Sequence, residues 1–351
     1  MIDTTAQAID RTREALEENP ESHWVIGFSG GKDSTALLKV FVAAAQASRT
    51  LPRLIDVIYC DTGVENPVLD TYVKTLLGKL ALEFAHASLP FRTTILKAPV
   101  ANRFFVKLIG RGYPPPTNSF RWCTKNLRIR PVATFIRKAA VGSAVVALGM
   151  RRAESQQRDR SLARSGGDVW QMQMEGGRQY RMFLPILDLD VYEVWRAVFE
   201  LSDPKSIDAK ALAVLYRGAA GECPIIRAPQ APPCASGRFG CWTCTVVRKD
   251  RSSRSLVDAG HRYLLPYLEF RDWLAEIRND GDRRWPTRRN GRAGAGPFTL
   301  ETRVEIFDRL KKLERTVGVE LLPKEERDEI GRLWELDVET ERSRLKLGGG
   351  V

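Results

Sequence analysis

Residues 26–35, IGFSGGKDST, end a short apolar run with a turn that contains glycines, a lysine, an aspartate and serines. The apolar residues before the turn favour a buried strand, and DSTALLKVFVAAAQA (33–47) has the composition and spacing of a helix. Glycines at a strand-to-helix turn let backbone N–H groups approach an anion, and the helix N-terminus adds positive potential. The stretch therefore predicts a phosphate-binding loop.

The same strand–helix alternation continues along the chain. We expect strands at 23–29, 53–63, 92–99 and 143–150, and helices at 4–18, 33–47, 66–82 and 127–140. This alternation predicts an α/β fold in which a parallel twisted sheet carries helices on both faces. Ligands bind such sheets at the carboxyl ends of the strands. The loop, Asp61–Glu65 and Arg151 each follow a predicted strand, so we expect them at that edge.

The spacing of the loop excludes two common phosphate-binding motifs. Gly27 and Gly31 enclose three residues where a Walker A loop needs four, and Asp33 follows the lysine where that loop needs Ser or Thr. The G-x-G-x-x-G pattern of dinucleotide-binding proteins is absent. The run resembles instead the PP-loop signature, S-G-G-x-D-S, of ATP pyrophosphatases, which cleave ATP between its α and β phosphates. The resemblance implies an adenine nucleotide α-hydrolase-like fold and a site for ATP and Mg²⁺.

The PP-loop resemblance assigns the first nucleotide contacts. They fall on Ser29, Gly30, Gly31, Lys32, Asp33 and Ser34, with Lys32 neutralising charge on the leaving pyrophosphate.

Two further stretches resemble the sulfate-nucleotide reductase branch of the PP-loop families. In YCDTGVENP (59–67), Asp61 would bind a ribose hydroxyl or Mg²⁺ and Glu65 would orient substrate or metal; a capping aspartate beside a turn glycine is the plain alternative. In GMRRAESQQR (149–158), Arg151 and Arg158 would contact phosphates, for which the planar guanidinium is well shaped.

Four cysteines are concentrated in one Pro- and Gly-rich segment. Intervals of ten, six and two residues separate Cys223, Cys234, Cys241 and Cys244. A C-x-x-C pair with two further cysteines nearby indicates a metal site, and four thiolates suit either structural zinc or an iron–sulfur cluster. Spacing alone does not separate the two, and unligated buried cysteines are the simpler alternative.

SGRFGCWTCTVVRKDRS (236–252) and FRWCTKNLRIRP (120–131) resemble the PP-loop proteins of bacterial DNA phosphorothioation systems, the DndC and SspD types, with the SspD type preferred. The resemblance spans residues 22–300. It implies a 4Fe–4S cluster, DNA as substrate and a cysteine desulfurase as sulfur donor. It also implies other phosphorothioation proteins, such as nickase or ATPase components, as partners.

Cys123 has two interpretations in this resemblance. It would replace Cys223 as a cluster ligand, or it would carry a persulfide near the nucleotide. We expect its basic neighbours Arg121, Lys125 and Arg128 to lower its pKa, although they would also suit phosphate binding. The predicted catalytic residues are Lys32, Asp33, Asp61, Arg151 and Cys123.

The chain is strongly basic, with a net charge of +12 and a pI of about 9.6. Such an excess favours polyanionic partners. Residues 282–292 place several arginines around Trp285, a composition that suits single-stranded nucleic acid but equally a solvated loop. The predicted nucleic-acid contacts are Arg121, Arg128, Arg283, Arg284, Arg288 and Arg289.

We expect three consecutive segments: a PP-loop ATP pyrophosphatase domain (1–204), a Cys-rich iron–sulfur segment (205–281), and a basic loop with C-terminal helices (282–351). No run of residues is long and apolar enough to span a membrane, so no membrane partner and a cytoplasmic location are expected.

The predicted function is ATP-dependent adenylation of a DNA backbone phosphate, followed by its sulfuration to a phosphorothioate. Two alternatives stay open: a phosphoadenosine (or adenosine) phosphosulfate reductase, and a tRNA-thiolating PP-loop enzyme. The first usually has a nucleophilic cysteine near its C-terminus, and no cysteine lies beyond Cys244.

Overall fold

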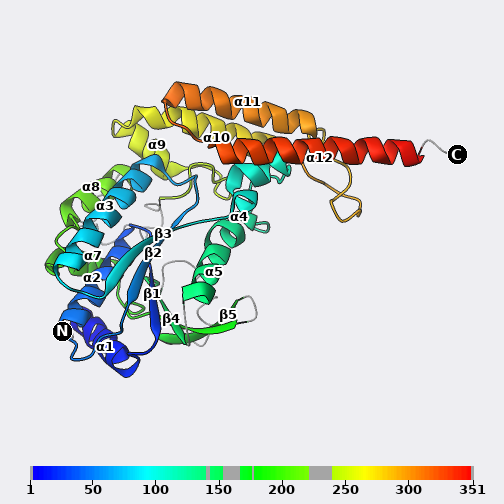
Figure 1. The fold of residues 1–351 in the computed structure, drawn as a ribbon. Coiled ribbons are helices and arrows are strands. Elements are labelled where there is room, and N and C mark those ends of the chain that lie inside the picture. Colours follow the sequence, from blue (N-terminus) through cyan, green and yellow to red (C-terminus); the bar gives the residue numbers. More distant parts are fainter. Residues whose placement is uncertain (1–2, 140–142, 153–166, 176–177, 221–238, 349–351) are drawn as a thin grey trace. The chain divides into compact units, whose positions relative to one another are not determined.

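A computed structural model describes residues 3–139, 143–152, 167–175, 178–220 and 239–348 (Figure 1). The chain divides into two compact units, and neither is a continuous stretch. Unit 1 comprises Met1–Cys60, Asn66–Leu96 and Pro131–Phe239; unit 2 comprises Asp61–Glu65, Lys97–Arg130 and Gly240–Val351. The three segments expected from the sequence were defined by function, whereas these two units are defined by packing. The three segments therefore stay a prediction.

A six-stranded sheet, in the order β3-β2-β1-β4-β6-β5, is built on unit 1. β1 lies parallel to β2 and to β4, and β4 lies parallel to β6. The predicted α/β fold with a mostly parallel sheet is therefore confirmed. The antiparallel pair β5–β6 was not predicted. The strands are β1 (His23–Gly27), β2 (Ile55–Asp61), β3 (Phe91–Lys97), β4 (Ala144–Leu148), β5 (Trp170–Glu175) and β6 (Arg178–Phe183).

Helices cover both faces of the sheet, as the sequence predicted. Trp24 and Ile26 of β1 face a core shared with α1 (Thr4–Glu18), α2 (Lys32–Ala47), α3 (Pro67–His86), α7 (Val191–Glu200) and α8 (Ala209–Ala220). Val25, between them, faces a second core that contains Ile136 of α5 (Arg130–Ala139). Successive side chains of a strand point to opposite faces, so β1 serves both cores. Trp24 packs edge-on against Phe41 and Phe183, with ring centroids 5.8 Å apart in each pair.

Helix ends follow local signals in the sequence. Asn66 accepts a hydrogen bond from the Val68 N–H at the start of α3, with Pro67 in the first turn as expected. Asp190 and Glu193 form a capping box at the start of α7.

Unit 2 is mainly helical and is built around buried aromatic and arginine side chains. Trp242 packs against Phe105 and Tyr267, with ring centroids 5.9 and 5.0 Å away. Arg303, 3% exposed, donates hydrogen bonds to the Gly110 carbonyl and to Asp337, both at 2.8 Å. The α-helices of this unit are α4 (Trp122–Thr124), α9 (Arg251–Asp258), α10 (Leu265–Ile277), α11 (Leu300–Val317) and α12 (Lys324–Gly348). None of the helices in the described ranges combines the length and apolar composition needed to cross a membrane.

A buried carboxylate on β2 ties neighbouring strands of unit 1 together. Asp56 is fully buried and accepts hydrogen bonds from Arg92 Nε and Nη2 at 2.7 and 2.9 Å, while His23 Nε2 lies 2.9 Å from its Oδ2. Burial alone would raise the pKa of Asp56, but the hydrogen bonds and charges of His23 and Arg92 outweigh it, so the pKa lies below its ordinary value.

Asp56→Asn is expected to lower the free energy of unfolding by about 2 kcal/mol at neutral pH, because hydrogen bonds to a charged group contribute roughly 1.5–3 kcal/mol. A carboxylate whose pKa is lowered by folding stabilises the folded protein at pH values above its unfolded-state pKa. This stabilisation is lost as the pH falls through the folded-state pKa. The difference between wild type and variant should therefore shrink below about pH 3.9. Urea unfolding across pH measures it.

The matched control is Asp10→Asn, since Asp10 is 65% exposed and pairs only loosely with Arg13 at 3.6 Å. We expect Asp10→Asn to change the free energy of unfolding by no more than about 0.5 kcal/mol. Equal effects of the two substitutions, or a difference that does not vary with pH, would contradict the assigned role of Asp56.

Candidate functional site

The predicted phosphate loop joins β1 to α2, and the hydroxyl of Ser34 organises it. That oxygen accepts a hydrogen bond from the Ser29 N–H at 3.2 Å, lies 3.1 Å from Ser29 Oγ and donates to the Gly31 carbonyl at 2.9 Å. α2 begins at Lys32, and Gly31 caps it without a side-chain hydrogen bond. The first turn of α2 therefore offers backbone donors at the positive end of a helix.

Two glycines are required by the geometry of this loop. Gly30 has a φ of +71°, and a Cβ there would lie 2.1 Å from Val73 Cγ2. A Cβ on Gly149, just after β4, would lie 2.7 Å from the backbone oxygen of Asp33. The loop thus closes against the end of β4 at backbone contact distance. The requirement for glycine at position 149 was not predicted, because it arises from a contact with a distant segment.

Lys32, Asp33 and Arg151 form a buried charged group in unit 1. Lys32 Nζ lies 3.1 Å from Asp33 Oδ2, and Arg151 Nε donates to Asp33 Oδ1. Lys32 is 6% and Arg151 4% exposed. Burial by itself would raise the pKa of Asp33, but the two cations outweigh it and the pKa is lowered. The structure thus brings together three residues predicted from segments more than 100 positions apart.

Tyr216 of α8 also belongs to this group, and the sequence analysis missed it. The Lys32 backbone N–H donates to its hydroxyl at 3.0 Å, and Lys32 Nζ lies 5.3 Å from the centre of its ring. Its sequence context, ALAVLYRGAA (211–220), is an ordinary helical pattern that gives no signal of a site.

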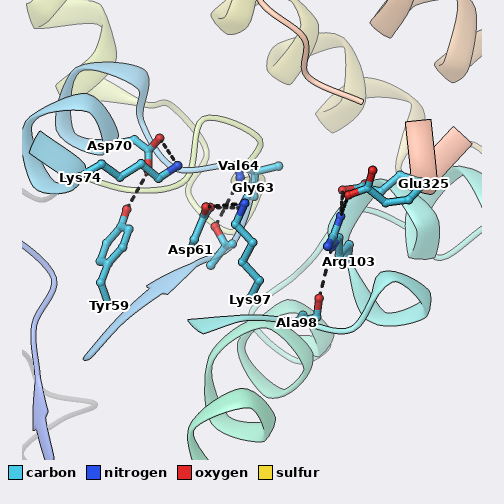
Figure 2. A network of polar contacts seen from close by, with 12 residues as sticks. Tyr59, Asp61, Gly63, Val64, Asp70, Lys74, Lys97, Ala98, Arg103 and Glu325 are labelled. Atoms are coloured by element: carbon cyan, nitrogen blue, oxygen red, sulfur yellow. Dashed lines mark hydrogen bonds and ion pairs between the residues drawn. The ribbon is translucent and has the colours of Figure 1, made fainter. Parts of the chain in front are cut away.

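Asp61 and Glu65, from the predicted D-T-G-x-E stretch, lie in unit 2. Asp61 accepts a hydrogen bond from the Gly63 N–H at 3.0 Å and lies 3.4 Å from Lys97 Nζ (Figure 2). Glu65 accepts hydrogen bonds from Thr62 Oγ1 and Arg128 Nη2, both at 2.9 Å. Asp61 thus makes the turn-capping contact of the plain alternative, while contacts with ribose or Mg²⁺ stay a prediction.

Two cysteines of unit 2 share one turn, in which the Cys244 N–H donates a hydrogen bond to the Cys241 carbonyl at 2.9 Å. Cys123, in α4, belongs to the same unit. Among the residues that the structure describes, no group of three or more His, Cys, Asp or Glu side chains is arranged to hold a metal ion. Cys223, Cys234 and Arg158 lie outside the described residues.

The expectation that basic neighbours lower the pKa of Cys123 is wrong. Burial raises the pKa of that thiol and outweighs the opposing charge of Arg121. Arg128 is directed to Glu65 instead, at 2.9 Å. Burial, reinforced by Glu65, also raises the pKa of Cys241. A metal ion at these thiols would have to displace their protons.

The arginines of the basic loop are largely occupied within unit 2. Arg283 pairs with Asp280 and Glu305, and Arg284 donates to the Gly296 carbonyl at 2.7 Å. Arg289 donates to the Arg111 carbonyl at 2.6 Å. The backbone N–H of Arg288 bonds to the Arg292 carbonyl, and Arg121 is exposed just before α4. A role in nucleic-acid binding for these residues stays a prediction.

Gly149→Ala is expected to disturb the loop, because the new Cβ meets backbone atoms that cannot move aside. We expect a loss of about 1–3 kcal/mol of folding free energy and weaker ATP binding, measured by urea unfolding and calorimetric titration. Gly78→Ala is the control: no atom lies within 4 Å of its Cβ position on α3, and helix stability should rise by roughly 0.5–1 kcal/mol. Unchanged ATP affinity in Gly149→Ala would remove the proposed constraint.

Comparison with known proteins assigns the chain to a family. Residues 23–246, more than half of it, match the model of the phosphoadenosine phosphosulfate reductase domain. No curated protein matches at a significant level.

Solved structures with some likeness include phosphoadenylyl-sulfate reductase from Candida auris in a phosphate complex. It has 13% identity and a TM-score of 0.38 and covers 60% of this chain and 85% of that chain. FMN adenylyltransferase from Candida glabrata, in complex with FMN and an ATP analogue, has 13% identity and a TM-score of 0.40, covering 87% and 82%. The U34-tRNA thiolase NcsA from Methanococcus maripaludis, with its [4Fe-4S] cluster, has 14% identity and a TM-score of 0.36, covering 61% and 74%. By the match over residues 23–246, the chain belongs to the phosphoadenosine phosphosulfate reductase domain family.

Proposed function

We propose that this protein is an ATP pyrophosphatase that transfers AMP to an acceptor and releases pyrophosphate. The observation that carries the proposal is the S-G-G-K-D-S loop at the start of α2, where the half-buried carboxylate of Asp33 holds Lys32 and Arg151. Membership of the phosphoadenosine phosphosulfate reductase domain family supports an enzyme that handles sulfur or nucleotides.

Two fixed cations beside helix donors suit a reaction that moves charge between phosphates. The guanidinium of Arg151 would bind two oxygens of one phosphate, and the ammonium of Lys32 would neutralise the leaving pyrophosphate. Asp33 holds both cations in place before the nucleotide arrives, so little reorganisation is needed on binding. Mg²⁺ would neutralise the remaining phosphate charge.

The acceptor in our proposal is a DNA backbone phosphate. Its non-bridging oxygen attacks the α-phosphorus of ATP, the bond to the bridging oxygen breaks and pyrophosphate leaves. A persulfide from a cysteine desulfurase then attacks the DNA phosphorus and AMP departs. A second thiol cleaves the S–S bond, leaving a phosphorothioate on the DNA and a disulfide on the donor. Adenylation is needed because a backbone oxygen is a poor leaving group and AMP is a good one.

Two other functions are consistent with the same family. A tRNA-thiolating enzyme would adenylate a base, and a sulfate-nucleotide reductase would instead reduce a small sulfur-bearing nucleotide. The net charge of +12 favours a nucleic acid over a small molecule.

With labelled ATP, the purified protein should form AMP and pyrophosphate. Lys32→Ala is expected to slow this by about 10²- to 10³-fold, as for loss of one charge-stabilising group. Lys79→Ala, which removes an exposed lysine of α3, should leave the rate unchanged. Formation of ADP and phosphate would contradict the proposed cleavage.

Nucleic acids from cells that express wild type or Lys32→Ala identify the acceptor. Phosphorothioate dinucleotides in digested DNA that disappear in the variant would support our proposal. Thiolated tRNA bases that disappear instead would favour the tRNA enzyme, and thiol-dependent release of sulfite from a sulfate nucleotide would favour the reductase.

We also propose a 4Fe–4S cluster on Cys223, Cys234, Cys241 and Cys244, with Cys123 as the replacement for Cys223. When bound, such a cluster supplies electron transfer. The shared turn of Cys241 and Cys244, with Cys123 in the same unit, supports a site with several thiols in unit 2.

Anaerobically purified protein should contain iron and absorb visible light, and Cys244→Ser should lose both. Cys60→Ser on β2 is the control and should retain them. Iron loss in Cys123→Ser but not in Cys223→Ser would identify Cys123 as the fourth ligand. Stoichiometric zinc in a colourless protein would contradict the cluster.

A further inference from the structure

A cavity of 1040 Å³ in unit 2 is not part of the site described above. Residues 117–119 and 245–249 form its walls, together with Arg251 at the start of α9, Ala275 of α10 and Arg278 just after α10. Four of its lining residues are cationic and none is acidic. Pockets for drug-sized ligands occupy about 300–1,000 Å³, so this cavity exceeds what one phosphate group needs.

The cations of this cavity differ from Arg283, Arg284 and Arg289 of the basic loop, whose side chains bond to neighbouring carbonyls or carboxylates. Arg248, Lys249 and Arg251 are exposed, and none of them pairs with a carboxylate of the described chain. Asp250, which lies among them in sequence, caps α9 instead, accepting hydrogen bonds from Ser253 N and Oγ at 3.0 and 2.7 Å. The positive charge is therefore available to a ligand.

A buried arginine fixes the backbone that carries these cations. Arg271 is 1% exposed and donates hydrogen bonds to the carbonyls of Cys244, Val247 and Arg248. A charged donor that satisfies three carbonyls holds the segment in one conformation. One wall of the cavity is thus held in place by the hydrogen bonds of Arg271.

Hydrogen bonds also join the chain segments that line the cavity to one another. Thr245 Oγ1 donates to the Pro116 carbonyl at 2.8 Å, and Arg278 Nη1 donates to the Thr245 carbonyl at 2.7 Å. Arg278 Nε is buried and has no hydrogen-bond partner among the described residues. A buried donor of this kind is costly unless a ligand or water accepts its proton.

We propose that this cavity binds the sugar–phosphate backbone of a single-stranded nucleic acid. Several separate cations and the polar side chains of residues 117–119 match a chain of phosphates better than one anion. Phe120, next to this wall in sequence, is 46% exposed and offers a ring for base stacking. A duplex is too wide to enter a cavity of this size and would touch only its rim.

The proposal deepens the proposed function, because it states where a nucleic-acid acceptor is held. Thr245, which lines the cavity, follows Cys244 directly in sequence. Binding does not require ATP cleavage, and the two proposals can therefore fail separately.

The test measures binding of a fluorescent single-stranded DNA of about 12 nucleotides, within the range for single-strand sites, to the full-length protein without ATP. The cavity variant is Arg248→Ala, Lys249→Ala, Arg251→Ala. The control variant is Arg49→Ala, Arg53→Ala, Lys79→Ala, which removes the same charge from exposed positions of unit 1. Circular dichroism and thermal unfolding check that both variants are folded.

The cavity variant should bind at least about 10-fold more weakly near 0.1 M salt, and the slope of log K against log salt should fall by roughly 2, since each phosphate contact on a single strand contributes about 0.7. The control should bind like wild type. Phe120→Ala should weaken binding at least about fivefold, and Phe120→Tyr should restore it.

Equal weakening by the cavity and control variants would overturn the proposal, because net charge alone would then explain binding. Displacement of the strand by AMP, inorganic phosphate or polyglutamate at an equal concentration of anionic groups would also overturn the proposal. The same holds if duplex DNA binds with the same affinity as the single strand. If ATP is not cleaved to AMP but the cavity variant alone loses the strand, the cavity proposal stands and the proposed function fails. If ATP is cleaved but the cavity variant binds normally, only the cavity proposal fails.

Discussion

The half-buried carboxylate of Asp33 is the group that holds the candidate site of unit 1 together. It holds Lys32 and Arg151, two cations from distant parts of the chain, at positions that are only 6% and 4% exposed. Two buried cations without an anion between them would repel each other and lose hydration, which is costly. Asp33 removes that cost while no nucleotide is bound. A phosphate that enters the loop would then meet cations that are already desolvated and positioned.

Backbone geometry supports this charged group. Gly149 allows the end of β4 to meet the backbone of Asp33, and Gly30 lets the loop pass Val73. The hydroxyl of Ser34 closes the turn from inside through Ser29 and Gly31. Each of these requirements is steric or a matter of hydrogen bonding within a few residues, which explains why the S-G-G-K-D-S run is informative on its own.

Arginine serves two different purposes in unit 2. Arg271 and Arg303 are buried and satisfy backbone carbonyls, so they add hydrogen bonds to a core that also contains aromatic side chains. Arg248 and Arg251 are exposed and without a carboxylate partner in the described chain. A count of basic residues in the sequence does not separate these uses. The stretch around Trp285 is the more basic of the two in sequence, yet Arg283, Arg284 and Arg289 bond to neighbouring carbonyls or carboxylates.

Features that depend on local spacing were predictable from the order of the residues. Periodicity located β1, α2 and α3, because burial of one face imposes a repeat that the chain must carry. The glycine, lysine and serine spacing likewise identified the loop. Features that depend on distant segments emerged from the folded chain. The tertiary structure added the β5–β6 pair and Tyr216, and it showed that burial raises the pKa of Cys123 despite its basic neighbours. Desolvation and charge act through space, and the neighbours that set them are chosen by the packing of the whole chain.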